Sequence, residues 1–160
     1  MAHGKLIFIM PVNSADAFEA FFNHTVRLCW DTLLNVTYVE GGGTHPRVGV
    51  ITANRGRGWK TGFSMRTRFL SYDPPRQASA AMAEPTGLFE QWAASMRFQD
   101  RDDGGSDLIY TFSIKLRPRY IGTLFDPLAA FLFAWETRRR FKAMALYLQQ
   151  QYEQSRITSN

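Results

Sequence analysis

The sequence predicts an α+β domain in which a curved antiparallel sheet of seven strands wraps around one long C-terminal helix. Three observations carry this prediction. Strand-like segments follow one another at hairpin spacing, without the strand–helix alternation of a parallel doubly wound sheet. Apolar and polar residues alternate along these segments, which gives the sheet one apolar face. The chain then has a run without glycine or proline at 128–153, far longer than an average helix of about 11 residues.

The elements follow a simple order along the chain. A first strand is expected at 5–12, and two short helices follow at 15–22 and 25–34, the first with Ser14 as its N-cap. Six further strands, separated by turns rich in glycine or proline, are expected at 35–40, 47–53, 60–72, 77–84, 89–100 and 107–116. Asp126 and Pro127 read as the N-cap and first residue of the terminal helix. We expect one domain at 1–154 and a polar tail at 155–160.

Composition and charge narrow the class of protein. Hydrophobic residues make up 45% of the 160 residues and aromatic residues 14%, which excludes an intrinsically disordered chain. The net charge of +5 is compatible with an anionic partner, but it also favours solubility. The single cysteine, Cys29, excludes an internal disulfide. Because the apolar run at 6–10 is too short for a signal-peptide core or a membrane span, a cytoplasmic protein is expected.

The alternation predicts which side chains face the interior. In the last strand Leu108, Tyr110, Phe112, Ile114 and Leu116 share one face. On the terminal helix a stripe at helical spacing should cover that face; it consists of Ala134, Thr137, Phe141, Met144, Leu148 and Tyr152. The alanines of 77–84 lie opposite large aromatic residues. They can interdigitate with them in a filled core or leave a cavity, and both readings stay open.

Four stretches resemble a known superfamily: the junction from Met10 to Phe18, Trp30, residues 92–98 with 104–110, and the helical segment 136–144. They resemble the SRPBCC superfamily, also called START-like or Bet v 1-like, and in particular its bacterial polyketide cyclase/dehydrase and lipid-transport type. The resemblance covers about residues 3–153. It implies the helix-grip fold, in which a strand, two short helices and six strands precede a long helix gripped by the sheet.

The resemblance also implies a function. It suggests that a hydrophobic or amphipathic small molecule, such as a lipid, quinone or polyketide, is bound between sheet and helix by a carrier or sensor. A cyclase or dehydratase is the alternative, and an interaction module without a ligand is a third. A pocket of a few hundred Å³ is expected. Its expected lining is Phe63, Met65, Phe69, Met82, Trp92, Met96, Tyr110, Phe112, Phe141 and Met144.

Candidates for catalysis are few. Glu84 shares a strand face with Met82, and Tyr110 lies on the apolar face, but a solvated strand end and a core tyrosine are the favoured explanations. With no paired carboxylate and no orienting histidine, the enzyme ranks below the carrier. His3, His24 and His45 are expected to be exposed loop residues, so no metal site and no cofactor are expected.

Two predicted surface regions could contact a partner: a basic sheet face and an apolar helix segment. Arg66, Arg68, Arg97 and Lys115 should form a solvated outer sheet face; it lacks aromatic residues to stack on bases, so nucleic acid is not expected as a partner. The start of the terminal helix, 124–135, is apolar all round. We expect the two short helices to cover it on one side, with Phe133 nearest the surface. A peripheral membrane contact helped by residues 138–140, a homodimer and packing within the domain all stay open.

Overall fold

The computed structural model describes residues 1–57, 64–117 and 119–158, and of residues 119–123 the backbone alone. A β-strand is followed by two short helices, six strands and one long helix. The elements are β1 (Ala2–Met10), α1 (Ser14–Phe22), α2 (His24–Trp30), β2 (Leu34–Val39), β3 (Ile51–Gly56), β4 (Ser64–Asp73), β5 (Gln77–Met82), β6 (Phe89–Asp100), β7 (Ser106–Leu116) and α3 (Arg119–Thr158).

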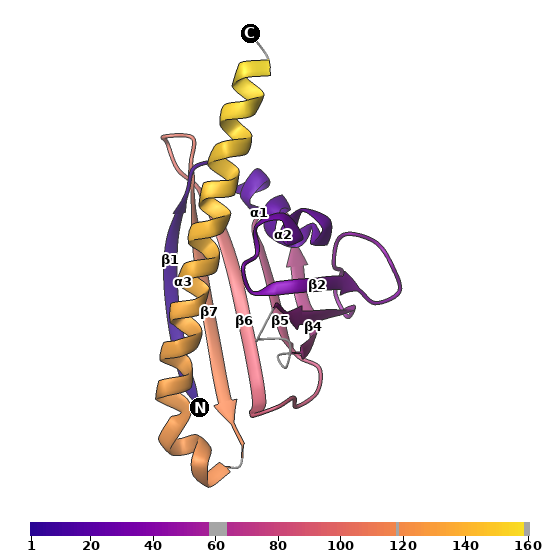
Figure 1. Ribbon diagram of the computed structural model, residues 1–160, viewed down its shortest axis with the longest axis vertical. Helices are drawn as coiled ribbons and strands as arrows, with labels where there is room; N and C mark the ends of the chain where they lie inside the picture. Colours follow the sequence, from indigo (N-terminus) through magenta and orange to yellow (C-terminus); the bar gives the residue numbers. More distant parts are fainter. Residues whose placement is uncertain (58–63, 118, 159–160) are drawn as a thin grey trace.

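The seven strands form one antiparallel sheet in the order β1-β7-β6-β5-β4-β3-β2. Consecutive strands from β2 to β7 are neighbours, and β1 returns to pair with β7. Figure 1 shows α3 running along β1 and β7, with α1 and α2 packed between the sheet and the later part of α3. This is the predicted α+β helix-grip architecture, a sheet wrapped around its C-terminal helix.

The predicted register of the sheet is confirmed. Leu108, Tyr110, Phe112, Ile114 and Leu116 are all buried. On the opposite face Arg68 and Arg97 are exposed, while Arg66 and Lys115 are partly covered because they pair with acidic neighbours. A slip of one residue would exchange these two sets of side chains, so the burial pattern fixes the interior face.

Several element boundaries differ from the prediction. The N-cap of α1 is Asn13, whose Oδ1 accepts from the Asp16 amide at 2.9 Å. The long helix begins at Arg119 and contains Pro127. The Asp126 carboxylate is therefore not the N-cap of this helix. It accepts instead from the Leu116 amide at 2.9 Å and the Met1 amine at 2.8 Å. The helix continues to Thr158, so the expected polar tail is largely helical.

The predicted stripe of α3 is right at Thr137, Phe141, Met144 and Leu148, which are buried. Tyr152 is exposed, because the end of α3 extends past the sheet (Figure 1). By the length and hydropathy expected of a membrane span, no helix in the described ranges qualifies.

The expectation for the start of α3 is wrong on two counts. Phe133 is partly buried, with its ring 4.8 Å from that of Phe112, while Phe131, Leu132 and Trp135 are exposed. Residues 133, 137, 141 and 144 share the stripe that meets the sheet, and Ala130 is buried one turn before it. Phe131, Leu132 and Trp135 therefore lie on the outward side of the helix. The short helices do not cover them, because they lie beside a later part of α3 (Figure 1).

Candidate functional site

A cavity of about 90 Å³ lies between the inner face of the sheet and the three helices. Its walls are mainly aromatic and methionine side chains. The cavity is smaller than the few hundred Å³ expected, since four phenylalanines from the helices, Phe21, Phe22, Phe133 and Phe141, take part in its lining. The strands contribute Met65, Phe69, Trp92, Met96 and Tyr110 together with the small residues Ala78, Ser79, Ala80 and Ala94.

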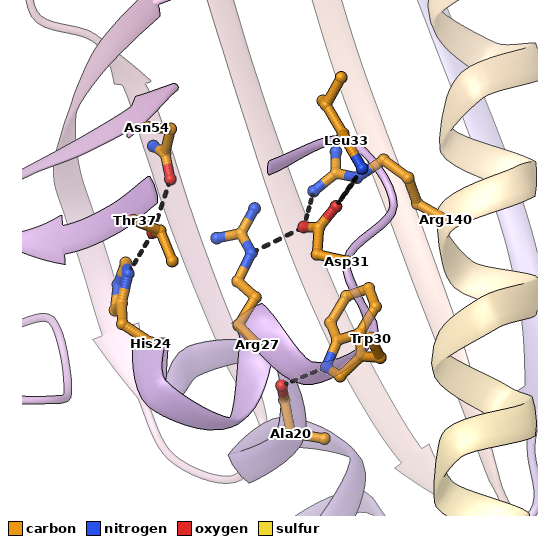
Figure 2. A network of polar contacts seen from close by, with 9 residues as sticks. All are labelled: Ala20, His24, Arg27, Trp30, Asp31, Leu33, Thr37, Asn54 and Arg140. Atoms are coloured by element: carbon orange, nitrogen blue, oxygen red, sulfur yellow. Dashed lines mark hydrogen bonds and ion pairs between the residues drawn. The ribbon is translucent and has the colours of Figure 1, made fainter. Parts of the chain in front are cut away.

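One end of the cavity is polar and charged. Asp31, directly after α2, is fully buried and accepts two hydrogen bonds from Arg140 of α3, at 2.9 Å to Oδ1 and 2.6 Å to Oδ2. Arg27 Nε donates to the same Oδ2 at 3.0 Å, and the Leu33 amide donates to Oδ1 at 3.0 Å. Figure 2 shows the carboxylate held between the two guanidinium groups. Both arginines line the cavity.

The protonation states of this cluster follow from its geometry. Burial alone would raise the pKa of Asp31, but the charges of Arg140 and Arg27 and the hydrogen bonds hold it well below its usual range. Burial would lower the pKa of Arg140, yet Asp31 raises it above its ordinary value. Burial lowers the pKa of Arg27, and this effect is larger than the opposite effect of Asp31. Because the ordinary pKa of an arginine is above about 12, Arg27 stays charged. Two cations therefore face one anion.

A second polar chain lies beside the cluster. His24 is buried, contrary to the expectation of an exposed loop residue, and its Nδ1 contacts Thr37 Oγ1. Thr37 donates its hydroxyl proton to Asn54 Oδ1 at 2.8 Å, so Nδ1 of His24 has to donate to Thr37 (Figure 2). Burial lowers the pKa of His24 to about 3, with smaller effects of Arg27 and His45, so the ring is neutral.

The corner between α1 and α2 sets these side chains in place. Trp30 Nε1 donates to the Ala20 carbonyl at 2.8 Å, which ties the end of α2 to α1 (Figure 2). The Asn23 side chain caps α2 by accepting from the Thr25 and Val26 amides. As a result Arg27 projects toward the sheet, with its guanidinium 4.2 Å from the centre of the Phe21 ring.

Two further polar groups face the cavity from the sheet. The Trp92 Nε1 is buried without a hydrogen-bond partner in the part of the chain that the structure describes. Burial raises the pKa of Tyr110, and the charges of Arg140 and Arg27 pull it down less strongly. Tyr110 therefore presents a protonated phenol to the cavity at neutral pH.

Known proteins match this chain in fold but not in sequence. No protein-family model and no curated protein matches the chain by sequence. Solved structures do match. A START superfamily protein from Mycobacterium smegmatis superposes with a TM-score of 0.72 at 9% identity, over 92% of this chain and 97% of that one. Ara h 8.0201 gives a TM-score of 0.70 at 11% identity, over 93% and 98%.

The protein has the START-like helix-grip fold. The same fold occurs in the di-domain ARO/CYC BexL from the BE-7585A biosynthetic pathway, with a TM-score of 0.74 at 7% identity. That match covers 93% of this chain and 47% of the larger protein. At these identities the comparisons establish the START-like fold, and the site has to be judged on its own residues.

Within this START-like fold, six of the expected lining residues do line the cavity: Met65, Phe69, Trp92, Met96, Tyr110 and Phe141. Phe112 and Met144 are buried in the surrounding core, outside the lining, and Met82 is partly buried away from the cavity. Phe63 lies outside the described residues. The use of these side chains in ligand binding is a proposal, taken up below.

Glu84, the weak catalytic candidate, does not face the cavity. It is exposed in the bend that follows β5 and pairs with Arg66 at 3.0 Å. Because β5 ends at Met82, Glu84 does not enter the interior, and the solvated position is the correct interpretation. Across residues 1–57, 64–117 and 119–158, no group of three or more histidine, cysteine, aspartate or glutamate side chains is placed to hold a metal ion.

Sequence reasoning missed the charged cluster. Arg140 was expected on the surface near lipid headgroups, but it is buried against Asp31. Its partner lies 109 positions earlier in the chain, and no local pattern links the two. The Arg27–Asp31 spacing of four residues was visible as a helical ion pair, but such pairs are usually solvated.

Proposed function

We propose that the protein binds a hydrophobic or amphipathic small molecule in this cavity and acts in the cytoplasm as a carrier or sensor. The observation that carries the proposal is the cavity itself, which combines aromatic and methionine walls with a buried polar end. Ligand pockets typically have this composition, a mostly apolar lining with few polar groups that fix orientation. The START superfamily and ARO/CYC names of the structural neighbours support a small-molecule role.

The size of the cavity is compatible with this role if its walls adapt. Met65 and Met96 line it, and the flexible thioether side chain can change rotamer with little cost. Phe133 lines the cavity at the start of α3 and is only partly buried, so its ring is less confined than the buried ring of Phe141 in the same stripe. A ligand larger than the cavity would displace these side chains first.

The test uses native mass spectrometry of the protein purified from its own source, with two variants of neighbouring residues on β6. Ala94 lines the cavity, while Ala93 lies on the opposite face of the sheet. Ala94→Phe should abolish a copurified small molecule and Ala93→Phe should retain it. Absence of any copurified compound, together with no uptake of added lipids or quinones, would overturn the proposal.

Catalysis is a distinct outcome of the same experiment. A cyclase or dehydratase would convert a bound polyketide-like compound, and Tyr110→Phe would then abolish turnover while leaving binding intact. Binding without turnover would assign the carrier or sensor role.

A further inference from the structure

The buried charges of the cavity do not balance. Arg27 and Arg140 both line it, and their common partner Asp31 carries a single negative charge. Among the described lining residues there is no aspartate or glutamate, and His24 next to the cluster is neutral. Counted over the lining residues and Asp31, the polar end of the cavity therefore holds a net charge of about +1, while Glu136 of α3 acts on Arg140 from outside the lining. An uncompensated charge in such a partly buried site is costly.

Asp31 has no free acceptor site for further hydrogen bonds from the arginines. Its two oxygens already accept four hydrogen bonds, two from Arg140, one from Arg27 Nε and one from the Leu33 amide. A carboxylate offers about four acceptor sites. The terminal nitrogens of Arg27 have no acceptor among the residues that the structure describes, and Figure 2 shows them pointing away from Asp31. Arg27 thus presents a free planar pair of donors at the cavity.

Resting on the proposed function, we infer that the cavity anchors its ligand by a carboxylate bound to the free donors of Arg27, with the apolar part of the ligand against the aromatic walls. A guanidinium matches the two oxygens of a carboxylate with parallel hydrogen bonds. One carboxylate also neutralises the net charge, whereas a phosphate monoester, with about −1.5 to −2, would leave the site negative. The ligand class is an amphipathic monocarboxylate.

Two neutral donors fit such a ligand. Tyr110 lines the same cavity as Arg27 and Arg140, and its hydroxyl is protonated at neutral pH. Trp92 lines the same cavity, and its buried indole N–H has no partner among the described residues. A small rotation of the ring would let this N–H bond to an oxygen elsewhere on the ligand. Both side chains also supply apolar ring surface, so they bind the amphipathic part without repelling a hydrocarbon chain.

The experiment compares decanoate with 1-decanol, which share a chain length and differ in charge. Affinities are measured by titration of tryptophan fluorescence for the wild type, Arg27→Met and the exposed-arginine control Arg68→Gln on the outer sheet face. Hydrogen bonds to charged groups correspond to about 10- to 100-fold in affinity. The wild type and Arg68→Gln should therefore favour decanoate by at least about tenfold, and Arg27→Met should remove this preference while keeping decanol binding.

Folding of Arg27→Met is expected to persist because Asp31 keeps its bidentate pair with Arg140, and circular dichroism checks it. Should that variant unfold, Arg27→Gln serves in its place, since it also removes the charge and keeps a polar side chain. Equal affinity of the wild type for acid and alcohol would overturn the carboxylate anchor and leave the proposed function standing. Failure of both compounds to bind would overturn the proposed function with it.

A separate observation concerns the outer side of α3. Its first described turns expose six large apolar side chains: Leu124, Phe125, Leu128, Phe131, Leu132 and Trp135. The next turns expose Arg138, Arg139 and Lys142 on the same outer side. Of the acidic residues in this segment, Asp126 is buried and Glu136 is partly buried. An apolar stripe followed by cations is the pattern of a helix that inserts at an anionic lipid surface.

We further propose that this stripe docks on an anionic membrane, with the apolar side chains inserted and the cations at the headgroups. Charge complementarity favours lipid over a second copy of the chain, since a dimer through this face would gather like charges from both copies. Phe133 connects the stripe to the cavity, because it follows Leu132 directly and lines the cavity from the other side of the helix. Docking would therefore place the lining near the source of an amphipathic ligand.

Vesicle sedimentation tests the docking. Wild type should bind vesicles of phosphatidylcholine with phosphatidylglycerol more than tenfold better than vesicles of phosphatidylcholine alone, and added salt should weaken the binding. Trp135→Ser with Phe131→Ser should abolish it, and Ile9→Ser, at an exposed apolar residue of β1, should not. Absence of vesicle binding by the wild type would overturn the proposal, as would a stable dimer that Trp135→Ser converts to monomer without any change in lipid binding.

Discussion

Replacing Asp31 with asparagine removes the negative charge between Arg27 and Arg140 and keeps the shape of the side chain. The amide oxygen can still accept from the Leu33 amide, but the charge-assisted bonds to both arginines are lost. Breaking a buried ion pair from one side typically costs about 3–5 kcal/mol. Because one hydrogen bond survives, we expect the lower end, about 3 kcal/mol of unfolding free energy.

Urea unfolding followed by tryptophan fluorescence at pH 7 measures this loss. At about 2–4 °C per kcal/mol for a chain of this size, the melting temperature should fall by about 6–12 °C. The loss should persist in high salt, since a buried pair is weakly screened. The matched control is Asp73→Asn, which breaks an exposed pair with Arg76 and should cost less than about 1 kcal/mol.

The pH dependence adds a second check. The folded pKa of Asp31 lies below the unfolded value of 3.8, so its contribution is fully present above that value. As the pH falls below about 4, the unfolded state takes up the proton first, and the difference between wild type and Asp31→Asn should shrink by about 1.4 kcal/mol per pH unit. A loss for Asp31→Asn at pH 7 no larger than that of the exposed control would refute the reasoning.

Three more predictions concern the surroundings of the cavity. His24 is neutral in the folded state, with its pKa lowered to about 3, so acid should favour the unfolded state below pH 6.5. The wild type should lose about 2 kcal/mol of unfolding free energy between about pH 6.5 and 5, and His24→Gln should not show this loss. The same pH dependence in both proteins would contradict this. Phe133→Ala should cost about 2 kcal/mol in urea unfolding, because a partly buried ring is removed, while uptake of bulkier ligands improves; unchanged ligand size selection would argue against Phe133 as a wall. Gly4→Ala would place its Cβ 2.3 Å from the ring of Phe112 and should cost about 1–3 kcal/mol, whereas a neutral effect would mean that the ring moves freely.

The periodicity of the chain determined the interior of the sheet. Alternation along β7 put Tyr110 and Phe112 inside, and alternation along β4 put Met65 and Phe69 on the same side, as the structure confirms. A strand has two faces, so a period of two residues assigns each side chain without knowledge of its neighbours. For the same reason the five expected residues on strands that do line the cavity could be named in advance: Met65, Phe69, Trp92, Met96 and Tyr110.

Tertiary structure decided the start of α3. Residues there are apolar on every side, so the local pattern gives no preferred phase for the helix. The phase followed from the later stripe through Phe141 and Met144, which meets the sheet and turns Phe133 inward and Trp135 outward. Which face of a helix is buried depends on the surface it packs against. A segment that is apolar on every side has no sequence pattern that indicates this face.

The same holds for the charged end of the cavity. Short-range periodicity predicted the inner face of the sheet and the element order of the fold. It left open whether the interior is filled or hollow, and the expectation of a cavity came from the family resemblance. The burial of Arg140 depends on its pairing with Asp31, which the fold brings from 109 positions away. A charged side chain on its own favours the surface, because burial removes it from water. It is buried only where a partner of opposite charge offsets that cost. The polarity of the cavity was therefore decided by tertiary structure alone.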